Sequence, residues 1–318
     1  MMESNGNLLK QGMISGLRRG WHSFLWMMQI IVPVSFLTTL LAWGGWLDHL
    51  DGILQPAMRL INLPAAAALP LIIGMLTGIY GGIAAMLSLP LTREQMTLIG
   101  IFILTAHNLV QEGIIQGKSG IHPVKATLCR VGVAIVTLLL LTPWFAHPTS
   151  AATITDVTAS TMRPLLSTAL QTWVVNSARF TIKAFLIIMS LLTLLEVLKA
   201  SGRIEYVVAL FAPFLKIMGL DRKLAFLWIT AIFFGLAYGG SIIMEESRAG
   251  TLSQEELETL HLSIGINHSL IEDTLLLVAL GLSAFWLYVP RLLMAIMAVH
   301  FLNAWHRFSK RNVPKLGR

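Results

Sequence analysis

Long apolar runs recur along this chain, and they constrain its fold more than any other feature. Only 12% of its residues are charged, about half the share of a soluble domain. A helix needs roughly 20 apolar residues to cross a bilayer. The runs that approach this length are Phe24–Trp43, Leu98–Ile115, Ala126–Pro143, Ile182–Leu198 and Leu275–Val289. The sequence therefore predicts an all-α polytopic membrane protein, embedded in a lipid bilayer.

The chain also contains an internal repeat, in which residues 20–146 resemble residues 177–306. Rare polar residues match in the same order in both halves, and chance is a poor explanation for such matches. The matched groups are Tyr80-Gly81-Gly82 with Tyr238-Gly239-Gly240, His107 with His268, Glu112 with Asp273, and Arg130 with Arg291. We therefore expect two halves of similar structure.

Each half has the same predicted order: a long apolar helix, an amphipathic segment, a glycine-interrupted apolar stretch and two further helices. The amphipathic segments are Leu47–Leu63 and Ile204–Leu220, and the interrupted stretches are Pro64–Pro90 and Arg222–Ser247. If each interrupted stretch is a re-entrant helical hairpin tipped near its Tyr-Gly-Gly sequence, each half has three spanning helices and the halves are inverted. If each stretch spans the membrane, the chain has eight crossings and both halves point the same way.

The positions of the basic residues favour six spans. Eight spans would place a lysine and arginine cluster between residues 199 and 223 outside, whereas such clusters belong in the cytoplasm. The net charge of +7 also reflects basic residues at helix ends, so no nucleic-acid partner is predicted. The expected organisation, in a bacterial-type inner membrane, is a cytoplasmic tail (1–19), a first repeat (20–146), a periplasmic linker (147–176), a second repeat (177–306) and a basic cytoplasmic tail (307–318).

Ionisable and polar residues inside the predicted spans are the candidates for a functional site, because they are costly in a membrane. They form two groups that the repeat relates to each other. These groups are His107, Asn108 and Gln111 in the first half, and Asn267, His268 and Glu272 in the second. Secondary transporters with inverted repeats place their binding site at the midplane, between the repeats. We therefore expect both groups to line one site.

Helical spacing predicts which of these side chains share a face. At 100° per residue, His268 lies one turn from Glu272, and His107 lies one turn from Gln111. His261 falls on the same stripe as His268 and Glu272. Imidazole and carboxylate groups on one face could bind a divalent transition metal, relay a proton or bind a polar substrate. The tentative metal ligands are His107, His261, His268 and Glu272; the alternative is that these side chains only hold neighbouring helices together.

Two further acidic residues are each followed by an arginine at the same distance along the sequence. Glu112 precedes Arg130 and Asp273 precedes Arg291 by the same number of residues, in the last two helices of each half. A buried charge that lacks a partner is strongly destabilising. We therefore predict two structural ion pairs, Glu112–Arg130 and Asp273–Arg291.

The order of elements resembles the Gate, or nucleoside recognition, superfamily. This superfamily includes the core of concentrative nucleoside transporters, the membrane domain of FeoB-type iron transporters and the spore maturation proteins A and B. The resemblance covers about residues 20–306 and rests on architecture. It implies that the hairpin tips and the unwound helices line the substrate site. The residues so implied are Tyr80, Gly81, Gly82, Tyr238, Gly239, Gly240 and Ser241, together with His107-Asn108 and Asn267-His268.

The function expected from these features is transport of a small cationic or polar solute through a midplane site. Histidine with carboxylate favours a divalent metal or a proton-coupled substrate. The alternatives are a nucleoside or nucleobase transporter, and a non-transporting membrane factor that acts through partners. An enzyme is not predicted, because the sequence contains no nucleophile elbow, HExxH or paired-aspartate signature. The sequence does not identify a cofactor: a divalent metal and a coupling ion both stay open, and no organic cofactor is expected. The family resemblance allows a homo-oligomer.

Overall fold

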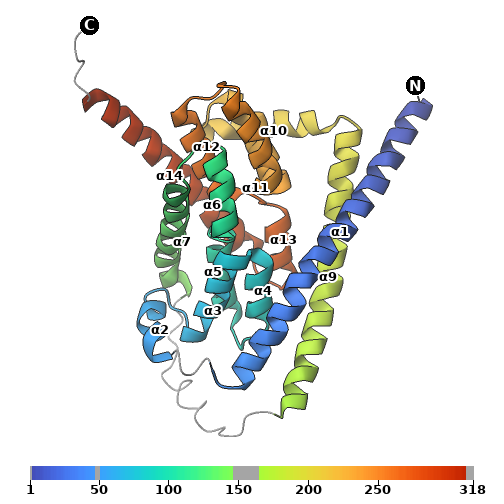
Figure 1. The fold of residues 1–318 in the computed structure, drawn as a ribbon, viewed down its shortest axis with the longest axis vertical. Coiled ribbons are helices and arrows are strands. Elements are labelled where there is room, and N and C mark those ends of the chain that lie inside the picture. The colour runs from blue at the N-terminus through green and yellow to red at the C-terminus, as the bar shows by residue number, and fades with distance from the viewer. Residues whose placement is uncertain (1, 47–50, 146–164, 313–318) are drawn as a thin grey trace.

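The computed structural model describes residues 2–46, 51–145 and 165–312, and these are folded into helices with no β-strand among them. Figure 1 shows them as a bundle with two long helices along one side. The α-helices are α1 (Met2–Trp43), α2 (Asp51–Arg59), α3 (Ala68–Thr77), α4 (Ile79–Leu87), α5 (Arg93–Thr105), α6 (Leu109–Lys118), α7 (Pro123–Phe145), α9 (Leu166–Ala200), α10 (Ile204–Ile217), α11 (Ala225–Arg248), α12 (Gln254–Asn267), α13 (Glu272–Ala279) and α14 (Ala284–Asn312).

Six helical segments among the described residues are long and apolar enough to cross a membrane. Two of them, Arg93–Lys118 and Gln254–Ala279, each consist of two helices separated by a break. The six segments are Asn7–Trp43, Arg93–Lys118, Pro123–Phe145, Leu166–Ala200, Gln254–Ala279 and Ala284–Ser309. The prediction of an all-α polytopic membrane protein is confirmed.

One predicted span was wrong, and the structure adds detail at the predicted linker and tails. The apolar run Leu275–Val289 is divided between α13 and α14, because Gly281 adopts a left-handed φ of 87° that ends the helix there. The predicted linker 147–176 already contains the start of α9 at Leu166, and residues 146–164 lie outside the described part. The described residues of both predicted tails are also helical, because they continue α1 and α14.

The two long helices α1 and α9 pack against each other in antiparallel fashion, at the right of Figure 1. Three glycines one turn apart on α1 make this close approach possible. A Cβ atom on Gly16 would lie 2.4 Å from the Cα atom of Thr193, and one on Gly12 would lie 2.9 Å from the Cβ atom of Ala200. Any larger residue at Gly16 would therefore push the two helices apart.

Both halves of the chain show the same succession of elements after their long helix. An amphipathic helix (α2 or α10) is followed by two helical arms that meet at a glycine, then by a broken helix (α5/α6 or α12/α13), and finally by a continuous one (α7 or α14). This order agrees with the predicted repeat. The inverted relationship of the two halves stays a prediction.

The two arms fold back as helical hairpins, whose tips lie near the Tyr-Gly-Gly sequences, as predicted. The turns are at Gly78 and Gly235, whose φ angles of 96° and 78° favour glycine. The Tyr-Gly-Gly glycines lie in the second arm and allow the arms to touch. A Cβ atom on Gly81 would lie 1.9 Å from Thr77 Oγ1, and one on Gly239 would lie 2.6 Å from the Cα atom of Ala231.

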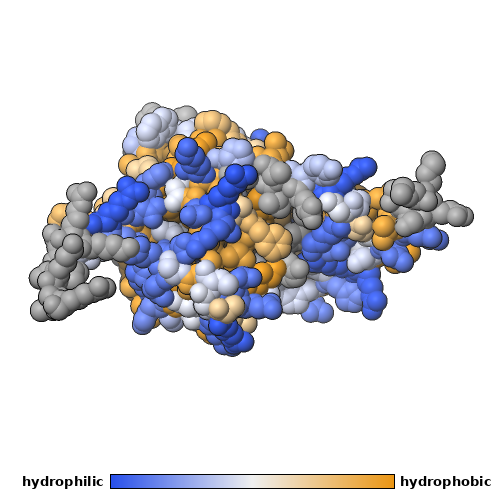
Figure 2. Space-filling model, turned by 90° about the horizontal axis from the view of Figure 1, so that it is seen from above, coloured by the Kyte–Doolittle hydropathy of each residue, from blue (hydrophilic) through white to orange (hydrophobic). Residues whose placement is uncertain are grey.

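Figure 2 views the molecule from the top of Figure 1, where α10 and the start of α12 lie. Hydrophilic side chains gather on this face around an apolar centre. Exposed basic residues of the predicted cytoplasmic cluster, such as Arg203, Arg222 and Lys223, belong to elements at this end. The end that the sequence assigns to the cytoplasm is therefore polar, as a face in contact with water should be.

Candidate functional site

The candidate site forms where the two broken helices meet. The first break has Asn108 in a left-handed conformation (φ 48°), and the second has Ser269 in the same region (φ 47°). A break inside a membrane frees backbone groups that the protein itself must satisfy. The backbone N–H of Asn108 donates to the carbonyl of Gly74 (3.0 Å), and that of Leu270 donates to the carbonyl of Ile232 (3.1 Å). Each break is thus attached to the first arm of a hairpin.

Two buried arginines satisfy the carbonyl groups at the breaks. Arg130 donates from Nε to the carbonyl of Thr105 (3.0 Å) and from Nη2 to that of His107 (2.9 Å). Arg291 donates in the same way to the carbonyls of Ile266 and His268. These side chains are 1% and 0% exposed, so the two arginines are internal caps for the C-terminal ends of α5 and α12.

The two predicted ion pairs have different outcomes. Arg130 Nη1 lies 2.5 Å from Glu112 Oε2, so the first pair is formed. Within the described part of the chain, Asp273 makes no ion pair with Arg291, and the Asp273–Arg291 prediction was wrong. The reason is geometric, because Asp273 points its Oδ2 atom toward His107 Nε2, at 3.6 Å. Arg291 Nη1 is left with no hydrogen-bond partner.

Three side chains from both halves converge at the centre. His268 Nε2 lies 3.1 Å from His107 Nε2 and 3.0 Å from Glu112 Oε1. The distance from His107 Nε2 to Glu112 Oε1 is 3.2 Å. All three residues are buried, and their ligand atoms lie within 4.8 Å of one another. The structure therefore joins the two histidines that the repeat related, as expected for one shared site.

The hydrogen bonds of the other ring nitrogens assign the tautomers. Nδ1 of His107 lies 2.7 Å from the carbonyl oxygen of Ile103, and Nδ1 of His268 lies 2.9 Å from that of Ile264. A carbonyl oxygen only accepts, so each Nδ1 carries the hydrogen and each neutral ring presents a lone pair at Nε2. Both lone pairs then face an oxygen of Glu112. Three acceptors this close repel one another unless a cation, either a proton or a metal ion, lies among them.

The cluster has the dimensions of a transition-metal site. Metal–nitrogen and metal–oxygen bonds of about 2.0–2.1 Å in a tetrahedral Zn²⁺ site place neighbouring ligand atoms about 3.3 Å apart. The three separations here are 3.0, 3.1 and 3.2 Å. The outer contacts also suit a metal centre, because each His Nδ1 donates to a carbonyl and the carboxylate is held by Arg130. His107, His268 and Glu112 could hold one divalent ion with little rearrangement.

Two of the predicted metal ligands do not belong to this cluster. Glu272 accepts a hydrogen bond from the Tyr80 hydroxyl (2.9 Å) instead. The helix break after His268 removes the regular register on which the one-face prediction for Glu272 depended. His261 shares the α12 stripe with His268 but lies two turns away, which is about 10 Å along a helix. Glu112 takes the carboxylate position, and the sequence interpretation missed this because it paired Glu112 with Arg130 alone.

The remaining predicted site residues lie around the breaks and hairpins. Asn108 donates to the side chain of Gln111 (3.0 Å), and Gln111 is exposed. Asn267 is buried, and neither amide atom has a hydrogen-bond partner. Ser241 is exposed, and the side chain of Tyr238 lies outside the described residues. The predicted hairpin glycines have packing roles: Gly81, Gly82, Gly239 and Gly240.

Comparisons with known proteins support one conclusion, that the chain is a membrane protein. No family model matches the chain, and no solved structure matches it. The chain is 24% identical over 315 residues to the uncharacterized membrane protein YvoD of Bacillus subtilis (strain 168). That similarity covers 96% of this chain and 99% of the relative. Together with the six apolar helical segments, it identifies the chain as a multi-pass membrane protein.

Proposed function

We propose that this protein transports a divalent transition metal ion through a site formed by His107, His268 and Glu112. The observation that carries the proposal is the convergence of two imidazole lone pairs and a carboxylate oxygen within 3.2 Å of one another. Nitrogen ligands favour metals such as Zn²⁺ over Mg²⁺ and Ca²⁺, which prefer oxygen ligands only. A bound metal cation would attract the two imidazole nitrogens and the carboxylate oxygen, which repel one another without it.

The position of the cluster supports transport rather than a fixed structural metal. His107 and His268 lie near the middle of the 26-residue segments Arg93–Lys118 and Gln254–Ala279. Broken helices with a midplane site between repeats are the arrangement of many secondary transporters. The proposal includes the inverted arrangement of the halves, membership of the Gate superfamily, and an inner-membrane location with both termini in the cytoplasm. The site is then reachable from either side when one half moves against the other.

Metal binding is the direct test. The purified protein in nanodiscs is stripped with a chelator and titrated with Zn²⁺ by equilibrium dialysis. We expect one ion per chain, and a loss of affinity of at least about 100-fold in His268→Ala and in Glu112→Gln, because each variant removes a ligand. Glu272→Gln is the matched control, because it changes a half-buried carboxylate just beyond the second break that accepts a hydrogen bond from Tyr80. The affinity of this variant should stay within about threefold of wild type.

Transport is tested by the same variants in proteoliposomes. Wild-type vesicles should take up radioactive Zn²⁺, and His268→Ala vesicles should not. Uridine present in excess should not compete, whereas competition by uridine would favour the nucleoside alternative. Wild-type affinity for Zn²⁺ in the double variant His107→Ala, His268→Ala would refute the site.

A further inference from the structure

The two helix breaks carry a histidine and an acidic residue at the same backbone positions. In the first half, the left-handed residue Asn108 follows a histidine, and Glu112 comes four residues later. In the second half, the left-handed residue Ser269 follows a histidine, and Asp273 comes four residues later. The backbone N–H of Glu112 donates to the carbonyl of Asn108 (3.0 Å), and that of Asp273 donates to the carbonyl of Ser269 (3.2 Å). The two acidic side chains therefore start from equivalent points, in the first turn of α6 and of α13.

Each acidic side chain reaches the histidine of the other half. Glu112 Oε1 lies 3.0 Å from His268 Nε2, and Asp273 Oδ2 lies 3.6 Å from His107 Nε2. An aspartate is one methylene group shorter than a glutamate, so from an equivalent backbone position it ends farther from its histidine. The two halves thus supply four groups to one place, and Asp273 is the one that stands slightly apart.

The surroundings of Asp273 leave its charge available to a cation. The residue is buried, and its Oδ2 atom has no hydrogen-bond partner. Glu112 binds Arg130 through its other oxygen, Oε2, whereas Asp273 forms no ion pair with Arg291 among the residues that the structure describes. A buried carboxylate without a partner is strongly destabilising. A cation bound beside His107 would be that partner.

The distance from Asp273 to His107 is close to that between two ligands of one metal ion. Neighbouring ligand atoms of a tetrahedral Zn²⁺ site are about 3.3 Å apart, and Asp273 Oδ2 lies 3.6 Å from His107 Nε2. The torsion about the Cβ–Cγ bond of an aspartate is soft, so the carboxylate can turn further toward the cluster at little cost. His107 Nε2 carries a lone pair, because Nδ1 donates to the carbonyl of Ile103. Both atoms are therefore acceptors that an ion can join.

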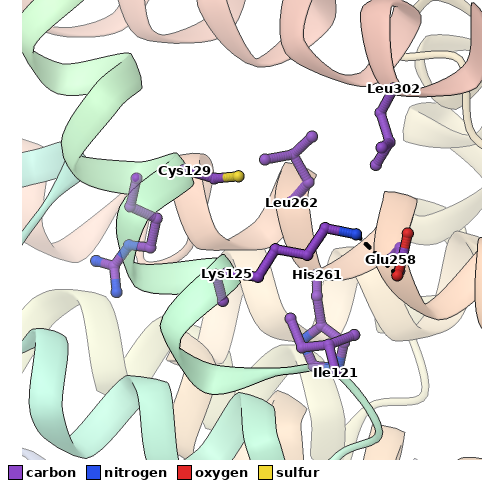
Figure 3. Close-up of a pocket in the computed structure, with 9 residues that line it drawn as sticks. Ile121, Lys125, Cys129, Glu258, His261, Leu262 and Leu302 are labelled. Atoms are coloured by element: carbon purple, nitrogen blue, oxygen red, sulfur yellow. Dashed lines mark ion pairs between the residues drawn. The ribbon is translucent and has the colours of Figure 1, made fainter. Parts of the chain in front are cut away.

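His261, the other buried histidine of α12, does not compete for this position. It lies two turns along the helix from His268, which is about 10 Å. It lines a cavity of about 50 Å³ next to the ion pair between Lys125 and Glu258, as Figure 3 shows. A fourth protein ligand at the cluster must therefore come from another residue, and Asp273 is in place.

We propose that Asp273 is the fourth ligand of the metal ion and sets which metals the site accepts. This inference deepens the proposed function, on which it rests. The completed site has two imidazole nitrogens, two carboxylate oxygens and no sulfur. Imidazole suits Zn²⁺ and Fe²⁺, carboxylate suits Mn²⁺, and Cu⁺ prefers sulfur ligands. The second carboxylate therefore extends the range of the site from Zn²⁺ toward Mn²⁺.

The affinities for two metals test this assignment. Asp273→Asn keeps the shape of the side chain and removes its charge. The chelator-stripped protein in nanodiscs is titrated with Zn²⁺ and, separately, with Mn²⁺ by equilibrium dialysis. We expect the variant to lose about tenfold in Zn²⁺ affinity and about 100-fold in Mn²⁺ affinity, because Mn²⁺ depends more on carboxylate oxygen. Asp273→Ser makes the same test if the asparagine variant does not fold, and Asp273→Glu, which keeps a carboxylate, should retain Mn²⁺ binding.

Two further measurements distinguish a ligand from a structural residue. The visible absorption spectrum of bound Co²⁺ depends on the number and kind of its ligands, so it should change in Asp273→Asn. In the presence of a chelator, the same variant should resist dodecyl sulfate at least as well as the wild type, because it removes a buried charge that has no partner. Glu272→Gln is the matched control, since it changes the neighbouring carboxylate, which accepts a hydrogen bond from Tyr80. It should leave both affinities within about threefold of wild type and the Co²⁺ spectrum unchanged.

The possible failures are distinguishable. Wild-type affinities and an unchanged Co²⁺ spectrum in Asp273→Asn would overturn the fourth ligand, while a loss of Zn²⁺ binding in His268→Ala would still support the metal site. Lower stability of Asp273→Asn in chelator, with unchanged affinities, would show that Asp273 is structural. Equal losses for Zn²⁺ and Mn²⁺ would overturn its role in selectivity. A wild-type protein that binds no divalent ion would refute the proposed function and the fourth ligand together.

Discussion

Replacing the two capping arginines should have unequal effects, although their roles at the helix breaks are alike. Arg130 and Arg291 each donate two hydrogen bonds to carbonyls at a break. Only Arg130 also contacts a carboxylate, Glu112, at 2.5 Å. We therefore predict that Arg130→Gln lowers the free energy of unfolding more than Arg291→Gln.

The magnitude follows from what each substitution leaves unpaired. Removing one partner of a buried ion pair typically lowers stability by about 3–5 kcal/mol, because the other charge stays buried. His268 Nε2 lies 3.0 Å from Glu112 and can take a proton, which compensates part of the charge. We therefore expect the lower end, about 3 kcal/mol, as the coupling energy between Glu112 and Arg130. For Asp273 and Arg291, which form no ion pair, we expect less than about 1 kcal/mol.

Two double-mutant cycles measure these couplings. Each cycle compares the wild type, an Arg→Gln variant, the matching Glu112→Gln or Asp273→Asn variant, and the double variant. Unfolding by dodecyl sulfate in mixed micelles, followed by tryptophan fluorescence with a chelator present, gives the four free energies. Additive effects in the Glu112–Arg130 cycle, or an equal coupling in the Asp273–Arg291 cycle, would refute the reasoning.

Four further tests address other parts of the structure. Gly16→Leu should destabilise the protein by about 1–3 kcal/mol, since even a Cβ atom would lie 2.4 Å from Thr193 Cα; unchanged dodecyl sulfate unfolding would contradict the close α1–α9 contact. Tyr80→Phe should lower the free energy of unfolding by about 0.6 kcal/mol, because the hydrogen bond to Glu272 is lost, and it should leave Zn²⁺ affinity unchanged. A large loss of affinity in dialysis would show that Glu272 contributes to the metal site. Zn²⁺ affinity should fall as the pH is lowered, because protons compete for both imidazoles and the carboxylate, and a pH-independent dialysis isotherm would exclude histidine ligands. A cysteine introduced at Ser201 should react with an impermeant reagent only from the cytoplasmic side, and labelling from the other side would support eight spans.

The sequence by itself determined the class of protein and the residues with unusual chemistry. Apolar runs of spanning length are a local property of the chain, so a multi-pass membrane protein could be predicted without any tertiary contact. The number of six spans came from the positions of the basic residues. The repeat singled out His107 and His268, and these do meet, at 3.1 Å. The Glu112–Arg130 pair was also predictable, because consecutive helices joined by a short loop must pack together.

Tertiary structure decided which side chains make the site. Helical periodicity placed Glu272 beside His268, but the left-handed Ser269 breaks the helix between them, and no local rule gives the direction of the chain after such a break. The approach of the two halves brought Glu112 to the histidines and left Glu272 with Tyr80. Near each Tyr-Gly-Gly sequence, the residue that makes the hairpin turn, Gly78 or Gly235, was decided in a similar way. The sequence showed glycines in both places, and only the packing of the two arms decided which glycine turns and which one allows close contact.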